Sequence, residues 1–239
     1  MNADQNQTSN AAPVAVTRPK PSARVVVIAI DGPSASGKST LARKLARELG
    51  YSYVDTGAMY RTLAWWCSAQ GLDVGNPRVV AAELNRWRTR LENIDGDIRL
   101  LVNGYFPTSE IRTARTTDAA SKIAVHRQVR TWMVALQRDC TRFGSLVMEG
   151  RDIGTNVFPE TDLKFFIDAS PDARKARRDA QGGAAAAAKL AERDRRDSQR
   201  RDDPLMPGLG TYRIDNTLET PDQTVQRLLA IVKERIPLK

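Results

Sequence analysis

The chain has 239 residues, a length that fits one domain with appendages or two small domains. Its longest apolar run outside an alanine-rich patch, residues 25–30, is too short to span a membrane. Two distant cysteines and one histidine give little support for a disulfide framework, a zinc site or a His-containing triad. The net charge of +9 favours anionic partners, but it does not choose among nucleic acid, acidic lipid and small phosphorylated molecules.

The N-terminal segment, residues 1–22, is rich in Gln, Asn, Ser, Thr, Ala and Pro and has no apolar stretch. We expect a disordered tail here and not a secretory signal, with an organelle-targeting peptide as the alternative. The folded domain is expected over residues 23–239. The few cysteines fit reducing, intracellular surroundings, so a cytoplasmic location is predicted.

From residue 25 the chain alternates between strand and helix patterns. Val25–Ile30 is β-branched and apolar, as in a strand covered on both faces, and it ends at Asp31. The segments that follow are a helix at Lys38–Leu49, a strand at Tyr51–Asp55, a helix at Gly57–Gln70, and strands at Ser145–Glu149, Asp162–Asp168 and Tyr212–Asp215. This order predicts an α/β fold built on a parallel sheet.

Residues 72–115 interrupt that alternation. Val80, Leu84, Trp87 and Leu91 have the spacing of an amphipathic helix. Short β-like runs follow, separated by Asp95-Gly96 and Asn103-Gly104, and predict an inserted antiparallel hairpin or three-stranded unit.

Two later helices have clear sequence signals. Trp132, Leu136, Cys140 and Phe143 form one stripe of a long helix, so Cys140 is interpreted as a core residue. The last helix begins after Thr220, with Pro221 at its first position and Gln223 completing a capping box. His126 is expected to be structural or solvent-exposed.

A phosphate-binding motif, GxxxxGK[ST], lies between the first strand and the first helix, at Gly32-Pro33-Ser34-Ala35-Ser36-Gly37-Lys38-Ser39 and continuing to Thr40. The glycines allow backbone N–H groups to face the phosphates, Lys38 supplies a charge near the β and γ groups, and Ser39 offers a hydroxyl to Mg²⁺. The motif predicts a site for a nucleoside triphosphate, taken to be Mg·ATP.

The motif leaves the phosphoryl acceptor open among water, a hydroxyl group and another phosphate. A switch GTPase should contain the guanine-binding NKxD sequence, and none is present. A hydroxyl acceptor benefits from a carboxylate base, for which Asp55 is available. A nucleoside monophosphate needs no base, but it needs cations that hold two repelling phosphates together. Arginines suited to this task include Arg61, Arg130, Arg151, Arg193 and Arg200.

Three segments behind the P-loop resemble the bacterial cytidylate kinases: Asp55-Thr56-Gly57-Ala58-Met59-Tyr60-Arg61, Glu149-Gly150-Arg151-Asp152-Ile153-Gly154-Thr155 and Glu192-Arg193-Asp194-Arg195-Arg196-Asp197. The resemblance runs from about Val26 to Val232. It implies a five-stranded parallel P-loop kinase core flanked by helices, an inserted subdomain for the nucleoside monophosphate (NMP) at 72–120, and a lid, a segment that closes over the nucleotides, at 171–203. Gly182-Gly183 and the five alanines after them depart from the family pattern.

The resemblance also implies an activity, phosphoryl transfer from ATP to CMP or dCMP with Mg²⁺. ATP would bind at residues 32–40, and the transferred charge would be stabilised by Lys38, Arg151, Arg193 and Arg200. For the metal, Ser39 and Glu149 are the main choices, with Asp31 and Asp55 as weaker ones. CMP would contact Thr56, Arg61, Ser121, Arg130, Arg151, Asp152, Arg193, Asp197 and Arg200.

Within this set, some roles also have a reason in the residues themselves. Asp152 can accept a hydrogen bond from the cytosine amino group, while Arg130 and Ser121 can donate to the ring acceptors. Arg193, Asp197 and Arg200 share one helix face, which also fits an ordinary salt-bridge ladder.

Two other functions stay open: a P-loop kinase for another small acceptor, and a basic RNA-binding protein switched by ATP. The arginine-rich stretch 174–201 has no aromatic residue, which argues against an RNA platform. The expected partners are therefore ATP and CMP or dCMP, with no nucleic acid requirement, no membrane, and a monomeric enzyme.

Overall fold

The structure is a computed structural model, which describes residues 25–182, 190–200 and 202–236. The predicted tail at 1–22 and the alanine run after Gly183 lie outside these ranges. Within them, every helix is too short or too polar to cross a bilayer.

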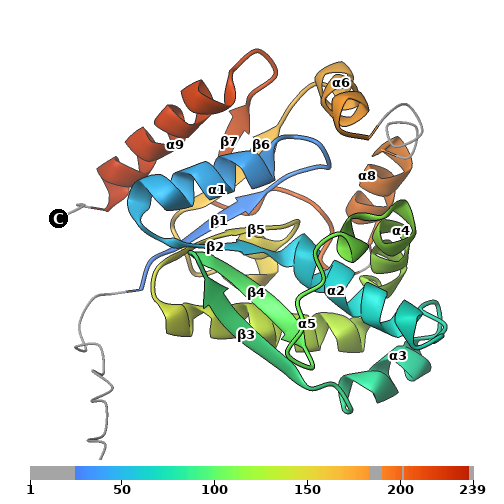
Figure 1. Cartoon of the computed structure of the whole chain (residues 1–239). Helices are drawn as coiled ribbons and strands as arrows, with labels where there is room; N and C mark the ends of the chain where they lie inside the picture. The colour runs from blue at the N-terminus through green and yellow to red at the C-terminus, as the bar shows by residue number, and fades with distance from the viewer. Residues whose placement is uncertain (1–24, 183–189, 201, 237–239) are drawn as a thin grey trace, which may run out of the picture.

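One seven-stranded sheet, in the order β3-β4-β2-β5-β1-β6-β7, forms the centre of the described chain (Figure 1). The strands are β1 (Val27–Asp31), β2 (Ser52–Asp55), β3 (Thr89–Ile94), β4 (Asp97–Val102), β5 (Leu146–Glu149), β6 (Lys164–Asp168) and β7 (Tyr212–Asp215). The neighbouring strands β2, β5, β1, β6 and β7 are parallel, which confirms the predicted five-stranded core. β4 extends it in parallel and β3 pairs with β4 in antiparallel, so the prediction of five strands was two short.

Helices cover both faces of this sheet. α1 and α9 pack on one face around Leu45 and Leu228, whereas α2, α3, α4 and α5 enclose the other core around Leu63 and Met133. α6 and α8 lie beyond the carboxyl ends of the strands, and α8 faces α4 (Figure 1). The helices are α1 (Lys38–Leu49), α2 (Thr56–Ala69), α3 (Pro77–Leu84), α4 (Ala114–Ile123), α5 (Arg127–Asp139), α6 (Pro171–Gly182), α8 (Leu190–Ser198) and α9 (Pro221–Arg235).

Local sequence signals determine where several helices begin and end. Helix α1 ends at Leu49 because Gly50 adopts a left-handed conformation and donates to the last carbonyls, as predicted. Thr220 and Gln223 form the predicted capping box of α9. Asp55 caps α2 by accepting from the Ala58 N–H at 2.7 Å, so the helix starts directly where β2 ends.

The inserted region differs from its prediction in one respect. α3 ends at Leu84, so Trp87 and Leu91 do not continue it; Leu91 lies in β3, opposite Leu100. Both residues are buried, which is why their spacing imitated a helix face. The hairpin turn at Asp95-Gly96 is confirmed, with both residues at positive φ.

The long helix predicted around Trp132 is wrong at its end. α5 stops at Asp139, and Cys140 begins a 3₁₀ turn that reaches Phe143. Cys140 is fully buried, as predicted, and burial raises the pKa of its thiol to about 12. A thiol that stays protonated in this way is a packing group and not a nucleophile.

Candidate active site

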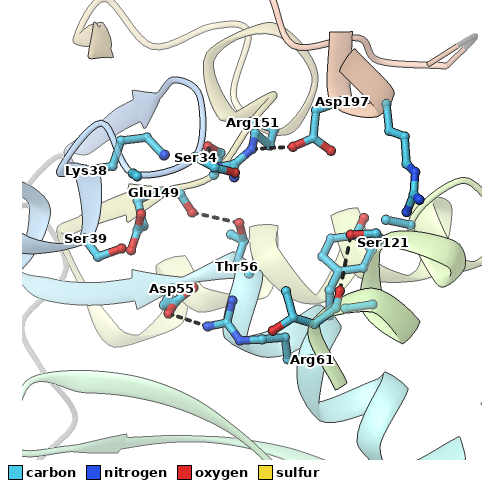
Figure 2. Close-up of a pocket in the computed structure, with 18 of the residues that line it drawn as sticks. Ser34, Lys38, Ser39, Asp55, Thr56, Arg61, Ser121, Glu149, Arg151 and Asp197 are labelled. Carbon is cyan, nitrogen blue, oxygen red and sulfur yellow. Dashed lines mark hydrogen bonds and ion pairs between the residues drawn. The ribbon is translucent and has the colours of Figure 1, made fainter. Parts of the chain in front are cut away.

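A cavity of about 470 Å³ opens at the carboxyl ends of β1, β2 and β5. In open parallel sheets, this edge is where ligands bind. The P-loop forms one wall, the ends of β2 and β5 form the floor, and α4, α5 and α8 form the far side (Figure 2). Side chains from segments far apart in the sequence therefore meet in one space.

The P-loop has the backbone conformation that its motif predicts. Gly32 has φ +148, and an added Cβ would lie 2.0 Å from the carbonyl oxygen of Ile167. Only glycine fits where the loop passes so close to β6. Gly37 at φ +93 then turns the chain into α1, and Ala35 is held at φ +60. Strain of this kind at a non-glycine residue occurs at ligand sites.

Two buried contacts hold the P-loop from behind. Asp31 accepts from the N–H groups of Ile153 and Gly154 at 2.9 and 2.8 Å, and burial raises its pKa to about 6. Both oxygens of Asp31 therefore bind the backbone after β5, and its place as a weaker metal ligand stays a prediction. On the other side, Asn216 and Arg177 both donate to the carbonyl of Ser36, at 2.9 and 3.2 Å.

Oxygen atoms gather on the floor of the cavity, beside Lys38 and Ser39. Glu149 accepts from the Tyr53 hydroxyl at 2.6 Å and hydrogen-bonds Ser39. Asp55 lies level with Glu149 on the neighbouring strand. Burial, followed by the Asp55 charge, raises the pKa of Glu149, so this carboxyl gains from any cation that arrives.

This donor set fits Mg²⁺. The ion prefers oxygen ligands, keeps several waters and is usually held by one or two carboxylates together with substrate phosphates. The Ser39 hydroxyl and the Glu149 carboxylate meet that requirement at the end of the P-loop. In the described part of the chain, no group of three or more His, Cys, Asp or Glu residues forms a closed metal cage.

The carboxylate of Asp55 is committed to Arg61. The Arg61 guanidinium donates to it at 3.0 Å (Figure 2). Burial acts to raise the Asp55 pKa, but the Arg61 charge and the Ala58 N–H hold it below its ordinary value. Thr56, next along the chain, donates to the carbonyl of Glu149 at 2.7 Å and ties the ends of β2 and β5 together.

Asp197 of α8 joins two arginines on the far side of the cavity. It accepts from Arg151 Nε at 2.8 Å and also pairs with Arg200. Arg151 in turn donates to the Ser34 hydroxyl of the P-loop at 2.9 Å. Arg151 therefore connects the P-loop with α8.

The remaining end of the cavity contains a buried guanidinium between two carboxylates. Arg130, 4% exposed, donates through Nη2 to Asp152 and through Nε to Asp203 at 2.8 Å. Ser121, one turn along α4 from Thr117, lines the same end. Tyr60 completes it, and burial raises the pKa of its hydroxyl to about 12, so it remains a neutral donor.

A family model described as cytidylate kinase matches residues 28–234. The chain belongs to the cytidylate kinase family. It is 42% identical to the cytidylate kinase of Solibacter usitatus, over 88% of this chain and 94% of the relative. It is 41% identical to that of Geobacillus kaustophilus, over 89% and 99%. A solved structure of an uncharacterized protein from Eubacterium ventriosum shares the fold, with a TM-score of 0.50 at 14% identity over 88% and 99%.

Most of the residues that the cytidylate kinase resemblance singled out line the cavity: Ser34, Ala35, Gly37, Lys38, Ser39, Thr40, Thr56, Arg61, Ser121, Arg130, Glu149, Arg151, Asp152, Asp197 and Arg200. Gly32, Pro33 and Ser36 of the P-loop are buried and do not line the cavity. Arg193 is in α8, but its side chain lies outside the described part of the chain. The roles assigned to these residues stay predictions.

Several residues at the site were missed by the sequence analysis. Arg178 and Arg196 line the cavity from α6 and α8, and Asp118 lines it from α4, where it pairs with Arg196 at 3.4 Å. Asn216, which donates to the Ser36 carbonyl, belongs to no motif in the sequence. A run of arginines in one helix gave a weak signal for Arg196, but nothing in the sequence indicates which ones point inward.

One contact of α8 reaches the P-loop directly. Asp194 accepts from the Ser34 N–H at 3.0 Å and pairs with Arg174 of α6. Main-chain amides of a P-loop are the groups that bind phosphate oxygens in this class of protein. In this structure, a carboxylate of α8 already engages one of these anion-binding amides.

Proposed function

We propose that this cytidylate kinase family member transfers the γ-phosphoryl group of ATP to CMP or dCMP, giving ADP and CDP or dCDP. The P–O bond between the β and γ groups breaks, and a new P–O bond forms to a phosphate oxygen of the monophosphate. The observation that carries the proposal is the meeting of a P-loop with Arg61, Arg151 and Arg200 in one cavity.

At the donor end, the P-loop amides and Lys38 would bind the β and γ phosphates. Lys38 Nζ lies 2.7 Å from the Pro33 carbonyl, so its ammonium is directed back over the loop. Arg151 and Arg200 lie across the cavity and would stabilise the charge that develops on the transferred group. Mg²⁺, when bound through Ser39 and Glu149, supplies charge neutralisation to the triphosphate.

At the acceptor end, Arg61 and Arg151 would bind the phosphate of CMP, and Arg130, Asp152 and Ser121 would bind the base. The acceptor needs no general base, because a monophosphate is largely ionised above its second pKa, about 6. This agrees with the state of Asp55, whose carboxylate is occupied by Arg61 and the α2 cap. A hydroxyl acceptor would need that carboxylate free.

The other parts of the prediction remain proposals. They include the NMP-binding insert at 72–120, the lid at 171–203, a monomeric state and a cytoplasmic location. The support for the insert and the lid is that α4 and α8 lie side by side at the cavity, where Asp118 of α4 pairs with Arg196 of α8 (Figure 1).

The test is ADP and CDP formation from ATP and CMP with Mg²⁺ and no RNA. Lys38→Ala should lower kcat by about 10²- to 10³-fold, because it removes a charge directed at the transition state. Lys44→Ala is the matched control: the residue is on the same helix, half-exposed and paired with Asp222 outside the cavity. Melting temperatures of all three proteins show that each is folded.

Turnover of CMP by the parent and by Lys44→Ala, but not by Lys38→Ala, supports the proposal. Turnover only with a hydroxyl-bearing acceptor favours the metabolite kinase instead. ATP hydrolysis that depends on added RNA favours the RNA-binding protein. Either of these results rejects cytidylate kinase activity.

A further inference from the structure

Asp203 is in an unusual backbone conformation in the loop that follows α8. Its φ is +51, in the left-handed region, and Pro204 comes directly after it. A residue before proline is normally extended, so this conformation is unfavourable unless surrounding contacts stabilise it. The loop turns back on α8, because Leu205 N–H donates to the carbonyl of Asp197 at 2.9 Å.

The contact that holds Asp203 is with the buried Arg130. One carboxylate oxygen lies 2.8 Å from both Nε and Nη2 of the guanidinium. Asp152 binds the same Nη2, and the Ala124 carbonyl accepts from Nη1 at 3.4 Å. Arg130 is thus held on three sides, and its orientation toward the cavity is determined by groups from α4, the turn after β5 and the loop after α8.

Two carboxylates share the Arg130 guanidinium at this end of the cavity. The side chains of Arg130 and Asp152 are 4% and 11% exposed, whereas that of Asp203 is 30% exposed. A largely buried carboxylate such as Asp152 attracts a hydrogen-bond donor and repels an acceptor. Cytosine presents an amino group at the position where uracil presents a carbonyl oxygen.

We propose that Asp203 is a positioning residue that sets the preference for cytosine over uracil. It acts through Arg130: it neutralises that guanidinium from the side away from the base, so that Asp152 keeps its negative charge available for the amino group. The proposal rests on the proposed function, since it assumes that a pyrimidine nucleotide occupies the cavity.

The position of Asp203 also connects the base to the phosphates. Asp197, in the same segment, binds Arg151 and Arg200, the arginines expected at the transferred phosphate. Asp197 and Asp203 thus supply one carboxylate to each end of the acceptor site. The contacts that select the base are complete only when α8 and the loop after it are in place.

The test compares kcat/KM for CMP and UMP in the parent, Asp203→Asn and Asp203→Glu. Asp202→Asn is the matched control, because it makes the same charge change at the preceding, exposed residue. We expect Asp203→Asn to lower the CMP/UMP ratio about tenfold, mainly through a higher KM for CMP. Asp203→Glu, which keeps the charge, should recover part of the preference, and Asp202→Asn should keep the parent ratio.

The ratio cancels any general loss of folded enzyme. An unchanged ratio in Asp203→Asn overturns the proposal, as does an equal fall in Asp202→Asn. Failure of the parent to phosphorylate CMP is a different result, because it rejects the proposed function and not only the role of Asp203.

Discussion

At the P-loop end of the cavity, the ligand would meet main-chain amides and one lysine from a single stretch of chain, residues 32–39. At the other end, it would meet arginines and carboxylates from β2, α2, α5, the turn after β5 and α8. The first end is supported by Asp31 and Asn216 behind the loop. The second is a set of ion pairs, including Arg61–Asp55, Arg130–Asp152 and Arg151–Asp197.

This difference affects the free-energy cost of binding an anion at each end of the cavity. The P-loop donors are backbone amides whose positions the loop conformation determines, and in the described part of the chain only the Ser34 N–H among them is bound by a carboxylate, that of Asp194. Each arginine at the acceptor end already has a carboxylate partner, so a ligand must share or exchange that partner. Exchange costs part of the pairing free energy, but it also opposes the binding of molecules that lack the matching groups.

Asp152→Asn tests that selectivity and should have the largest effect on it. An asparagine can turn its amide to present a donor, which suits the uracil carbonyl and leaves the cytosine amino group unpaired. We expect kcat/KM on CMP to fall by a factor that corresponds to about 1–3 kcal/mol, and kcat/KM on UMP to fall less or to rise. The measurement is the ratio of the two constants in parent and variant.

Asn156→Ala is a suitable control for this variant, since Asn156 donates to Asp152 at 3.2 Å but does not line the cavity. It should change the ratio by much less. Equal losses on CMP and UMP in Asp152→Asn would assign Asp152 to folding or to catalysis in place of base selection.

The two ends also differ in how far the sequence predicts them. The P-loop was predicted in full because eight adjacent residues carry its geometry. The residues that hold the loop from behind were not predicted. Asn216, for example, lies 180 positions from Ser36, and only the fold brings them together. The acceptor residues were found through the resemblance, since spacing along a chain does not reveal which arginine meets which carboxylate.

The errors in the predicted fold have the same origin. Leu91 has the spacing of a helix with Leu84, but cross-strand pairing with Leu100 places it in β3. That pairing depends on residues further along the chain, and a local pattern cannot include it. Asp203 gave no signal, because its function depends on a contact with Arg130 across 73 positions.

Asn216→Ala tests whether the hydrogen bonds behind the P-loop affect the binding of ATP and not that of CMP. The change removes the amide that donates to Ser36 and one acceptor of Arg177, which keeps its bonds to the backbone carbonyls of Ser36 and residue 216. A loop that loses one buried hydrogen bond of about 1 kcal/mol should bind ATP less well, so we expect a three- to tenfold rise, roughly, in KM for ATP. KM for CMP should change by less than twofold, roughly, as the ion pairs at the other end are intact.

Steady-state kinetics with each substrate varied in turn gives both constants. Asn85→Ala, at the exposed end of α3, controls for a general effect of losing an asparagine. Should both KM values rise together, the two ends would be coupled through the P-loop and the contrast between them would be lost.

The smallest effect on activity is expected at Asp31, where the measurement is stability against pH. Burial raises its pKa from 3.8 to about 6 despite the two N–H groups that it accepts, with Asp152 adding to the rise and Lys38 opposing it. The folded protein therefore holds a proton that the unfolded chain has lost between pH 4 and 6. Across that window, the Asp31 contribution to the free energy of unfolding falls as pH rises.

Asp31→Asn removes this titration while keeping the size of the side chain. As pH rises from 4 to 7, the free energy of unfolding of the variant should increase by about 2 kcal/mol relative to that of the parent. Urea unfolding of both proteins at each pH measures this difference. The contributions of the carboxylates that both proteins contain cancel in it. A difference that stays constant over this range would mean that Asp31 is ionised throughout, held by its two backbone donors and Lys38, and that the P-loop support is charged even in acid.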